Sequence, residues 1–404
     1  MNAAATPSSA PAALVIIGAG LAGWTTAREF RKLDSSTPIV LVTADSGDFY
    51  AKPTLSNACA QKRTAEQLVT TPAVKMAETL NVTLRANTQV TAIDTRAQCI
   101  SLAAGDGALH QMPYTHLVLA TGAHPIRIPL QGDAAAQVQS INQLTDLAQF
   151  QQHLGTSPKT VLIMGAGLIG CEFANDLVLG GHTVHVVDPA QRPLAALLPD
   201  GAGEQMQAAL AGIGVNWHFG TTVQSLQSST GAKPLHAQLS NGETVDVDLV
   251  VSAIGLRADT ALAQAAQIHC ERGVVVDEML QTSAAQVYAL GDCAQYASAG
   301  ARTLPYVMPI MNAARALAAT LAGTPTPLVF PLMPVSVKTP ALPTVVAAAH
   351  PATQGQWVAD PLDAEAALAG GAWRFIDAEG LQRGFVLTGK QTARRMELSK
   401  TTAL

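Results

Sequence analysis

Charged residues are scarce in this chain. Asp, Glu, Lys and Arg make up 13% of its 404 residues, about half of the roughly 25% that is typical of globular proteins. The formal net charge is −5, and no run of Lys and Arg is longer than two residues. Because binding to a phosphate backbone needs a basic stripe, the composition argues against nucleic acid as a partner.

Cysteine is also rare and shows no structural pattern. The five cysteines include no CxxC pair and no metal-ligand spacing, which argues against a zinc site and a disulfide framework. We interpret all of them except Cys59 as small apolar residues of a protein from a reducing compartment. The five are Cys59, Cys99, Cys171, Cys270 and Cys293.

Long apolar runs are missing as well. No stretch of about 20 apolar residues lacks charges and turn-forming residues, so we expect no membrane span. The first thirteen residues are small and polar and lack the basic start of a signal peptide. We therefore expect a cytoplasmic protein.

A βαβ unit is predicted near the start of the chain. Residues 14–17 form a β-branched, apolar run that is typical of a strand buried in a parallel sheet. The glycine-rich segment 18–23 follows, then a segment of helical character at 24–33 and a second strand at 39–42.

The same arrangement returns later in the chain. A strand at 160–164 leads into glycines at 165, 167 and 170, then a helix to Leu179 and a strand at 183–187. Repetition of a whole supersecondary unit indicates two nucleotide-binding domains.

The order of the apolar strands predicts that one domain is inserted into the other. Strands ending at Gly122 and Gly255 bracket the second unit, and a later strand ends at Asp292. Prolines and short β-branched runs after about Phe330 indicate a third, smaller domain. The predicted fold class is α/β, with two nested Rossmann-like domains and a C-terminal α+β domain. The predicted boundaries are 1–115 with 256–328, 116–255, and 329–404.

Both glycine motifs have the spacing GxGxxG between a buried strand and a helix. In this context the first glycine makes a tight turn, the second lets the backbone approach a pyrophosphate, and the third lets helix and strand pack closely. The phosphates then rest on the helix N-terminus. We interpret the two motifs as dinucleotide-binding loops.

An acidic residue about 20 positions after the first glycine of such a motif can hold a ribose diol. Asp188 stands at the end of the strand after the second motif. A carboxylate there repels a 2′-phosphate, so NADH is favoured over NADPH, although the nearby Arg192 favours the opposite choice. After the first motif the acid is Asp45, which could equally be a turn residue.

Glu172 has two possible roles in the first turn of the second helix. It could complement the helix dipole, or it could accept a hydrogen bond near a nicotinamide carboxamide.

The nested motifs, the turn Ala120-Thr121-Gly122 and the segment Leu290-Gly291-Asp292 together resemble the pyridine nucleotide-disulfide oxidoreductase superfamily of flavoproteins. The resemblance covers nearly the whole chain. It implies that the first unit binds FAD, that the second binds NAD(P)H, and that the aspartate of the Gly-Asp pair holds the ribityl-phosphate region of the flavin.

Longer segments resemble one branch of this family, the ferredoxin-reductase-like members. Residues 49–56 (FYAKPTLS) resemble a segment whose basic residue, here Lys52, lies against the flavin. Residues 304–311 (LPYVMPIM) and 333–341 (MPVSVKTPA) are most similar to members that reduce rubredoxin.

The predicted cofactor-binding residues combine the motifs with this resemblance, and Lys52 and Glu172 are expected to assist positioning. They are Gly18, Ala19, Gly20, Leu21, Ala22, Gly23, Ala44, Asp45, Lys52, Pro53, Val90, Thr121, Gly122, Arg127, Gly165, Gly167, Leu168, Ile169, Gly170, Glu172, Asp188, Gly255, Gly291, Asp292, Val307 and Lys338.

The disulfide reductases of this family need a redox-active cysteine pair, and this chain has none. Oxidases and peroxidases of the family use a single cysteine after the first unit, which leaves Cys59 as the candidate. The resemblance places Asn57 and not Cys59 at that position, and two residues along a helix turn a side chain by about 200°. We therefore expect Cys59 to be a buried, unreactive thiol.

The leading hypothesis is an FAD enzyme that takes hydride from NADH and passes single electrons to the iron of rubredoxin. The alternatives are the ferredoxin-reductase component of an oxygenase, an NADH oxidase or peroxidase that uses Cys59, and a flavin-binding regulatory protein. Rubredoxins are acidic, so we expect a basic rim for docking, with Arg302, Arg315 and Lys338 as candidates. We expect no protein metal site and a monomer.

Overall fold

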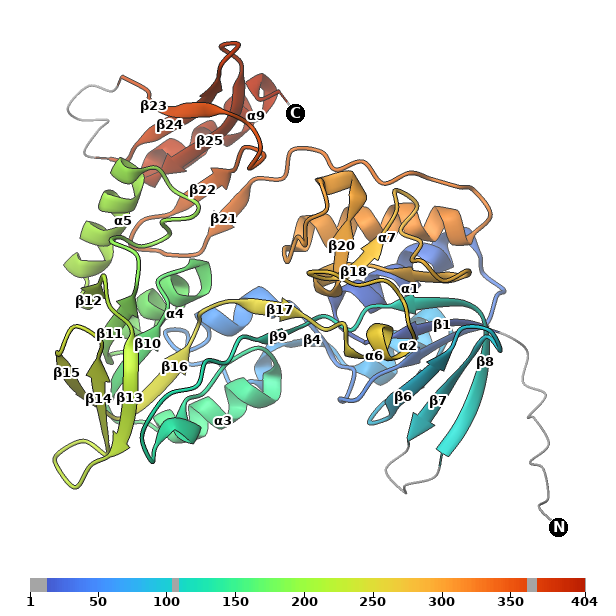
Figure 1. The fold of residues 1–404 in the computed structure, drawn as a ribbon, viewed down its shortest axis with the longest axis horizontal. Coiled ribbons are helices and arrows are strands. Elements are labelled where there is room, and N and C mark those ends of the chain that lie inside the picture. The colour runs from blue at the N-terminus through green and yellow to red at the C-terminus, as the bar shows by residue number, and fades with distance from the viewer. Residues whose placement is uncertain (1–12, 104–108, 362–368, 404) are drawn as a thin grey trace. The chain divides into compact units, whose positions relative to one another are not determined.

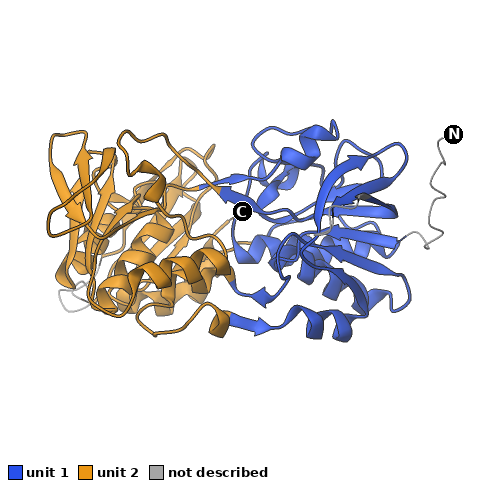
Figure 2. Ribbon diagram, turned by 90° about the horizontal axis from the view of Figure 1, so that it is seen from below, with its two compact units in different colours: residues 1–51, 69–124, 256–330 blue, residues 52–68, 125–255, 331–404 orange. Residues whose placement is uncertain are grey.

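The computed structural model describes residues 13–103, 109–361 and 369–403, so the expectation for residues 1–12 lies outside it. The chain divides into two compact units (Figure 2). Unit 1 comprises residues 1–51, 69–124 and 256–330, and unit 2 comprises residues 52–68, 125–255 and 331–404. Each unit is built from three separate segments of the chain.

Unit 1 is built around a seven-stranded sheet with the order β5-β2-β1-β8-β7-β6, in which β19 pairs with β8 (Figure 1). The central strand β1 runs parallel to both β2 and β8. All five of its residues are buried, as expected for a strand covered on both faces. The strands are β1 (Ala13–Ile17), β2 (Ile39–Val42), β3 (Phe49–Tyr50), β4 (Val69–Thr71), β5 (Val82–Arg85), β6 (Gln89–Asp94), β7 (Cys99–Ala103), β8 (Leu109–Leu119), β17 (Leu256–Ala258), β18 (Val274–Val276), β19 (Val287–Ala289) and β20 (Ala294–Tyr296).

The helices of unit 1 cover this sheet with their apolar faces. Trp24, Ala27 and Phe30 recur at helical spacing on α1 and are all buried. The indole Nε1 of Trp24 donates a hydrogen bond of 2.8 Å to the Gly47 carbonyl. The helices are α1 (Leu21–Leu33), α2 (Ala73–Leu80), α6 (Ala261–Ala265) and α7 (Val307–Leu321), with the 3-10 turns η4 (Gly291–Cys293) and η5 (Ala297–Ala299).

The described residues of unit 2 form three sheets: a parallel one of order β12-β11-β10-β16, a small one of order β13-β14-β15, and a C-terminal one of order β21-β22-β25-β24-β23. The first two share an apolar core that includes Leu162, Met164 and Leu226. The C-terminal sheet is antiparallel. The strands are β10 (Thr160–Met164), β11 (Thr183–Asp188), β12 (Val215–Phe219), β13 (Val223–Ser228), β14 (Leu235–Leu239), β15 (Thr244–Val247), β16 (Leu249–Ser252), β21 (Val335–Val337), β22 (Thr344–Ala347), β23 (Gly355–Ala359), β24 (Ala372–Asp377) and β25 (Gln382–Thr388).

The helices of unit 2 are mostly short. They are α3 (Leu144–Leu154), α4 (Leu168–Leu179), α5 (Asp200–Gly212) and α9 (Arg395–Thr401), with the 3-10 turns η1 (Lys52–Asn57), η2 (Glu66–Leu68), η3 (Ala135–Gln137) and η6 (Gly389–Arg394). Strand β9 (Ala123–Pro125), where the chain passes between the units, pairs with β17.

The α/β prediction is confirmed, and both βαβ units stand where the sequence predicted them. One helix boundary was wrong, because α1 begins at Leu21 and not at Trp24. Gly23 therefore lies within the helix. Its close packing against the preceding turn leaves no room for a Cβ. The three-domain division stays a prediction.

Candidate functional site

The first glycine loop follows β1, and each of its glycines has a separate steric reason. Gly18 has a φ of +108°, and a Cβ added there would lie 2.2 Å from the Ala120 carbonyl oxygen. A Cβ on Gly23 would lie 1.9 Å from the Gly18 carbonyl oxygen, whereas one on Gly20 would meet no atom within 4 Å. The first and third glycines of the loop therefore have no room for a side chain, whereas the second has free space beside it.

The second loop repeats this geometry in unit 2. Gly165 has a φ of +103°, and a Cβ on Gly170 would lie 1.9 Å from the Gly165 carbonyl oxygen. Space is again open at the middle glycine, Gly167. The two loops therefore have the same glycine geometry, one in each unit.

Both loops fit the pyrophosphate of a dinucleotide. Gly20 and Gly167 are the N-caps of α1 and α4, and neither provides a side-chain cap. The first N–H groups of a helix have no partner within the helix, and a Cβ added at Gly20 or Gly167 would meet no atom within 4 Å, so a ligand can approach the backbone there. An anion can accept hydrogen bonds from these groups and is favoured by the helix dipole.

Other predicted residues of unit 1 converge on the first loop. The amide of Ala120, directly before Thr121 and Gly122, donates a hydrogen bond of 2.8 Å to Ile17. A Cβ added to Gly291 would lie 2.9 Å from the Cβ of Ala22. The carboxyl ends of β1, β8 and β19 therefore meet at one edge of the sheet, where ligands of such folds bind.

Asp45 lies in the exposed turn after β2. Its Oδ1 accepts hydrogen bonds from the Thr43 hydroxyl at 2.6 Å and from the Gly47 amide at 2.9 Å. Asp45 is thus a turn residue by these contacts, and its ribose role stays a prediction.

Asp188 lies at the end of β11 and holds the second glycine loop. Its Oδ2 accepts a hydrogen bond of 2.6 Å from the amide of Ala166, and its Oδ1 accepts one of 2.7 Å from Ala190. Arg192 binds Asp200 instead of facing an open site, with its Nε at 3.0 Å and an Nη at 2.7 Å from Oδ1. The fixed charge beside the loop is therefore negative.

Glu172 is the most unusual residue of α4, because its side chain is fully buried. A buried carboxylate is costly unless it is paired and hydrogen-bonded. Its Oε2 accepts a hydrogen bond of 2.6 Å from the Ser56 hydroxyl and lies 2.8 Å from the Lys338 ammonium. Its Oε1 accepts the backbone amide of Lys338 at 2.9 Å.

Lys338 is held from several sides. Besides Glu172, its ammonium donates to Ser56 Oγ at 3.3 Å, to Asn57 Oδ1 at 3.0 Å and to the Pro53 carbonyl. Its side chain is still 37% exposed. We call Pro53, Ser56, Asn57, Glu172 and Lys338 the lysine cluster. It joins η1, α4 and the segment after β21, and it leaves a cation fixed at the surface of unit 2.

The sequence prediction missed most of the polar face of α4. Glu172, Asn175 and Asp176 are all buried and follow the spacing i, i+3, i+4. Asn175 Oδ1 accepts the Ala341 amide at 3.0 Å, and the two Asp176 oxygens accept the amides of Cys59 and Ala60 at 2.7 and 3.1 Å. A polar stripe inside an apolar helix was the signal that could have revealed this face.

Cys59 lies beside this stripe and has the properties of a structural thiol. Burial, together with the Asp176 carboxylate, raises the pKa of the thiol to about 11. Burial also raises the pKa of Asp176 to about 6, although the two backbone amides and Lys338 act in the opposite direction. Reactive cysteines have lowered pKa values, so this thiol is not prepared for redox catalysis.

The remaining predicted residues are not members of the lysine cluster, although Lys52 directly precedes Pro53 in η1. Half-buried Lys52 begins η1, Arg127 is exposed after β9, Gly255 follows β16, Val90 lies on β6, Asp292 on η4, and Val307 begins α7. Ala44 is exposed, Ala19 is buried, Leu21 and Leu168 are half-buried, and Ile169 is 40% exposed.

Two features are absent from the described part of the chain. Residues 13–103, 109–361 and 369–403 contain no group of three or more His, Cys, Asp or Glu side chains that could hold a metal. Within the same ranges, every helix is too short or too polar to cross a bilayer.

Two family models match successive parts of the sequence. The model described as pyridine nucleotide-disulphide oxidoreductase matches residues 12–318. The model described as rubredoxin binding C-terminal domain matches residues 327–402.

The sequence is also similar to curated proteins over nearly its whole length. It is 42% identical to the rubredoxin-NAD(+) reductase of Alcanivorax borkumensis, covering 96% of this chain and 97% of that one. It is 40% identical to the protein of the same name from Acinetobacter baylyi, with 96% of both covered. It is 39% identical to the nitric oxide reductase FlRd-NAD(+) reductase of Aeromonas salmonicida, covering 94% and 93%.

Solved structures share the fold. The chain superposes with a TM-score of 0.86 on a chain of the covalent putidaredoxin reductase-putidaredoxin complex, at 25% identity, covering 98% of this chain and 94% of that one. With the ferredoxin reductase for the CYP199A2 system of Rhodopseudomonas palustris the TM-score is 0.85, at 25% identity, covering 97% and 95%.

The open and closed glycines of the first loop make a matched pair of variants. We expect Gly23→Ala to cost about 1–3 kcal/mol of stability, because the methyl group collides with backbone. The methyl group added by Gly20→Ala would contact no atom within 4 Å, so we expect the stability of the apoprotein to change by less than about 0.5 kcal/mol. The same methyl group should block the approach of a pyrophosphate and weaken dinucleotide binding. Urea unfolding of both apoproteins and a binding titration check this; equal losses of stability would contradict it.

Cys59 is expected to react slowly. At pH 7 a thiol with this raised pKa supplies at least about 100-fold less thiolate than a free cysteine near pKa 8.5, so its alkylation by iodoacetamide should lag well behind that of cysteine in the same solution. Cys59→Ser should keep NADH-dependent turnover within about twofold, because a residue outside the chemistry changes little. Rapid alkylation, or loss of turnover in the variant, would show that the thiol takes part in the reaction.

Proposed function

This chain belongs to the pyridine nucleotide-disulphide oxidoreductase family, and we propose that it is a flavoenzyme that transfers electrons from NADH through FAD to rubredoxin. The proposal rests on one combination: two dinucleotide loops and a match to a rubredoxin-binding domain occur in the same chain. Relatives at 40–42% identity named rubredoxin-NAD(+) reductase support it.

The second loop is proposed to bind NADH. The amides at the start of α4 would donate hydrogen bonds to the pyrophosphate at Gly167, where an added Cβ would meet no atom within 4 Å. The Asp188 carboxylate favours a ribose diol over a 2′-phosphate. The Arg192 guanidinium is paired with Asp200 through Nε and one Nη, which reduces the positive charge that it would offer to a 2′-phosphate.

The first loop is proposed to bind FAD, in the same way, at Gly20. Bound FAD supplies a group that accepts hydride from NADH and can give up electrons one at a time. The contribution of the protein is then orientation, exclusion of water and electrostatic tuning. The Lys338 ammonium, fixed by the lysine cluster, is the proposed source of positive charge beside the flavin ring.

No protein thiol has a role in this scheme. The five cysteines are free, and the pKa of Cys59 is raised and not lowered. These observations support the rubredoxin assignment over an oxidase or peroxidase that uses Cys59. Free cysteines are also usual in a reducing compartment, and we propose a cytoplasmic location on that ground.

The acceptor is proposed from the C-terminal part of the chain. The match of residues 327–402 is to a rubredoxin-binding domain, whereas the likeness to a ferredoxin reductase is at 25% identity. These numbers favour rubredoxin over ferredoxin as the acceptor.

A steady-state assay tests the assignment. With NADH as donor, rubredoxin should be reduced at least about tenfold faster, in kcat/KM, than a [2Fe–2S] ferredoxin, and NADH should be preferred over NADPH by a similar factor. Ferricyanide as acceptor controls for reduction of the flavin. Equal values of kcat/KM with the two iron proteins would contradict the assignment of rubredoxin as the acceptor and would leave only the family membership established.

The charge of Lys338 should be visible in the flavin. We expect Lys338→Met to lower the midpoint potential of the bound flavin, because a cation stabilises the negative charge gained on reduction. A charge-assisted hydrogen bond of about 1.5–3 kcal/mol corresponds to roughly 30–60 mV for a two-electron couple. Spectroscopic redox titration measures the shift.

Two variants make this test specific. Lys390→Met removes an exposed lysine of the same unit and should leave the midpoint potential of the flavin unchanged. Lys338→Arg keeps the positive charge, so its midpoint potential should stay close to that of the unaltered protein. Identical potentials in Lys338→Met and Lys390→Met would contradict the role given to Lys338.

A further inference from the structure

The end of the C-terminal domain is basic, although the chain as a whole is not. Residues 389–401 carry four cations and one carboxylate, in a chain with a net charge of −5 and only 13% charged residues. These residues form η6 and α9. A local concentration of one sign on such a charge-poor protein can steer a partner of opposite charge.

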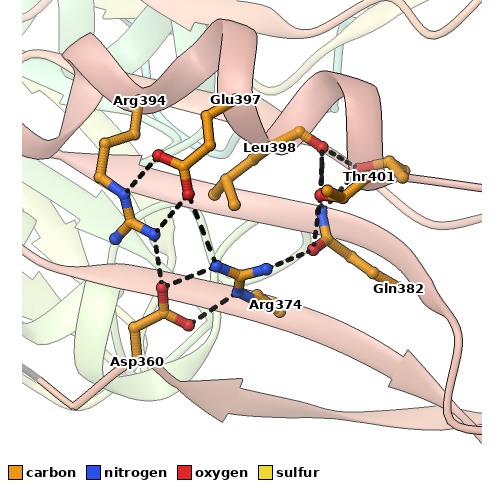
Figure 3. Close-up of polar contacts among 8 residues, drawn as sticks. Asp360, Arg374, Gln382, Arg394, Glu397, Leu398 and Thr401 are labelled. Carbon is orange, nitrogen blue, oxygen red and sulfur yellow. Dashed lines mark hydrogen bonds and ion pairs between the residues drawn. The ribbon is translucent and has the colours of Figure 1, made fainter.

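One side of α9 is clamped to the sheet by an ion network (Figure 3). Arg374 on β24 binds Asp360 through two hydrogen bonds, of 2.8 and 3.2 Å. Arg394 reaches the same carboxylate at 2.9 Å and binds Glu397 at 3.1 and 3.2 Å. The helix is therefore held in one orientation by charges on the sheet and on itself.

Neutral contacts hold the same side of the helix. Leu398 is fully buried, and its carbonyl accepts a hydrogen bond of 3.1 Å from the Gln382 amide. The Thr401 hydroxyl donates to Gln382 Oε1 at 3.3 Å (Figure 3). With Arg394 and Glu397, these residues follow the spacing of one helix face, which faces the sheet.

The outer side of the helix combines cations with an exposed apolar side chain. Met396 is 68% exposed, and Lys400, four residues later and thus on the same side, is also exposed. Arg395 borders Met396 and touches the Pro334 carbonyl at 3.5 Å. Lys390 is exposed at the start of η6.

The acidic residues that the structure describes in this domain are already paired. Within its described residues, the carboxylates of Asp360, Asp377, Glu379 and Glu397 form ion pairs with Arg374, Arg383 and Arg394. In the same part of the chain, the structure gives Lys390, Arg395 and Lys400 no carboxylate partner within 4.0 Å. Their charges remain available to a partner.

We propose that Lys390, Arg395, Met396 and Lys400, here called the α9 surface, dock the acidic surface of rubredoxin. The inference rests on the proposed function and adds the residues of the interface. Cations around one exposed methionine match the polar rim and apolar centre of protein interfaces. A patch of this size suits the small, transient contacts of electron-transfer partners.

This surface differs from the rim expected from the sequence. The Lys338 ammonium is paired with Glu172, and Arg302 donates its Nε to the Ala299 carbonyl at 2.8 Å. Arg302 and Arg315 belong to unit 1, and their part in docking stays a prediction.

The test is a pair of charge-reversed variants of the full-length holoenzyme. Lys390→Glu with Lys400→Glu changes the α9 surface and leaves Arg395, which contacts Pro334, untouched. The matched control is Lys75→Glu with Arg96→Glu, which makes the same charge change at two exposed cations of unit 1. FAD content and NADH–ferricyanide turnover should be unchanged in both.

At low ionic strength, the α9 variant should raise the KM for rubredoxin at least about tenfold, with kcat nearly unchanged, because steering acts on encounter. Its kcat/KM should depend less on salt than that of the unaltered protein. Met396→Ala should raise KM severalfold without changing the salt dependence. The control pair should alter KM by less than about twofold.

If the α9 variant and the control have the same KM and the same salt dependence, the α9 surface is not the docking site. If the unaltered holoenzyme oxidises NADH with ferricyanide but does not reduce rubredoxin, the proposed function fails first and the docking inference with it. The two failures are therefore distinguishable.

Discussion

The buried carboxylate of Glu172 is the constraint on which the arrangement of unit 2 depends. With no solvent exposure, it must be compensated by Ser56 from η1 and by the ammonium and backbone amide of Lys338. Two segments that are distant in sequence are thereby fixed to one helix. Removal of one partner from a buried pair commonly costs about 3–5 kcal/mol, so segments that supply such partners are held in place strongly. The same bonds hold one lysine at the surface, which gives the cluster both a structural and an electrostatic consequence.

Much of the fold could be predicted because its signals are local. The strands of both βαβ units are continuous apolar runs, and Gly23 and Gly170 are required by contacts within their own loops. The lysine cluster could not be predicted in the same way, because Glu172 and Lys338 are 166 residues apart and nothing local pairs them. Resemblance named both residues but not their contact. The α9 surface was missed because the pairing of Arg374, Arg383 and Arg394 is visible only once the sheet is folded.

The chemistry assigned to the chain divides among regions with different electrostatic character. Each dinucleotide loop offers backbone amides at a helix start, where the dipole favours phosphate. The lysine cluster offers one fixed cation, and the α9 surface offers several cations that have no carboxylate partner among the described residues. No cysteine has a role in the proposed chemistry: Cys171 and Cys293 are buried, and burial raises the pKa of Cys59. The account therefore assigns all the redox chemistry of the protein to its bound flavin.

The number of electrons that the holoenzyme stores tests this assignment directly. Anaerobic titration with dithionite, followed in the visible spectrum, should reach full reduction at two electrons per FAD, because the flavin alone accepts them. Uptake of four electrons per FAD, with a long-wavelength band from a thiolate beside the flavin, would reveal a second redox group made of sulfur and would contradict the account.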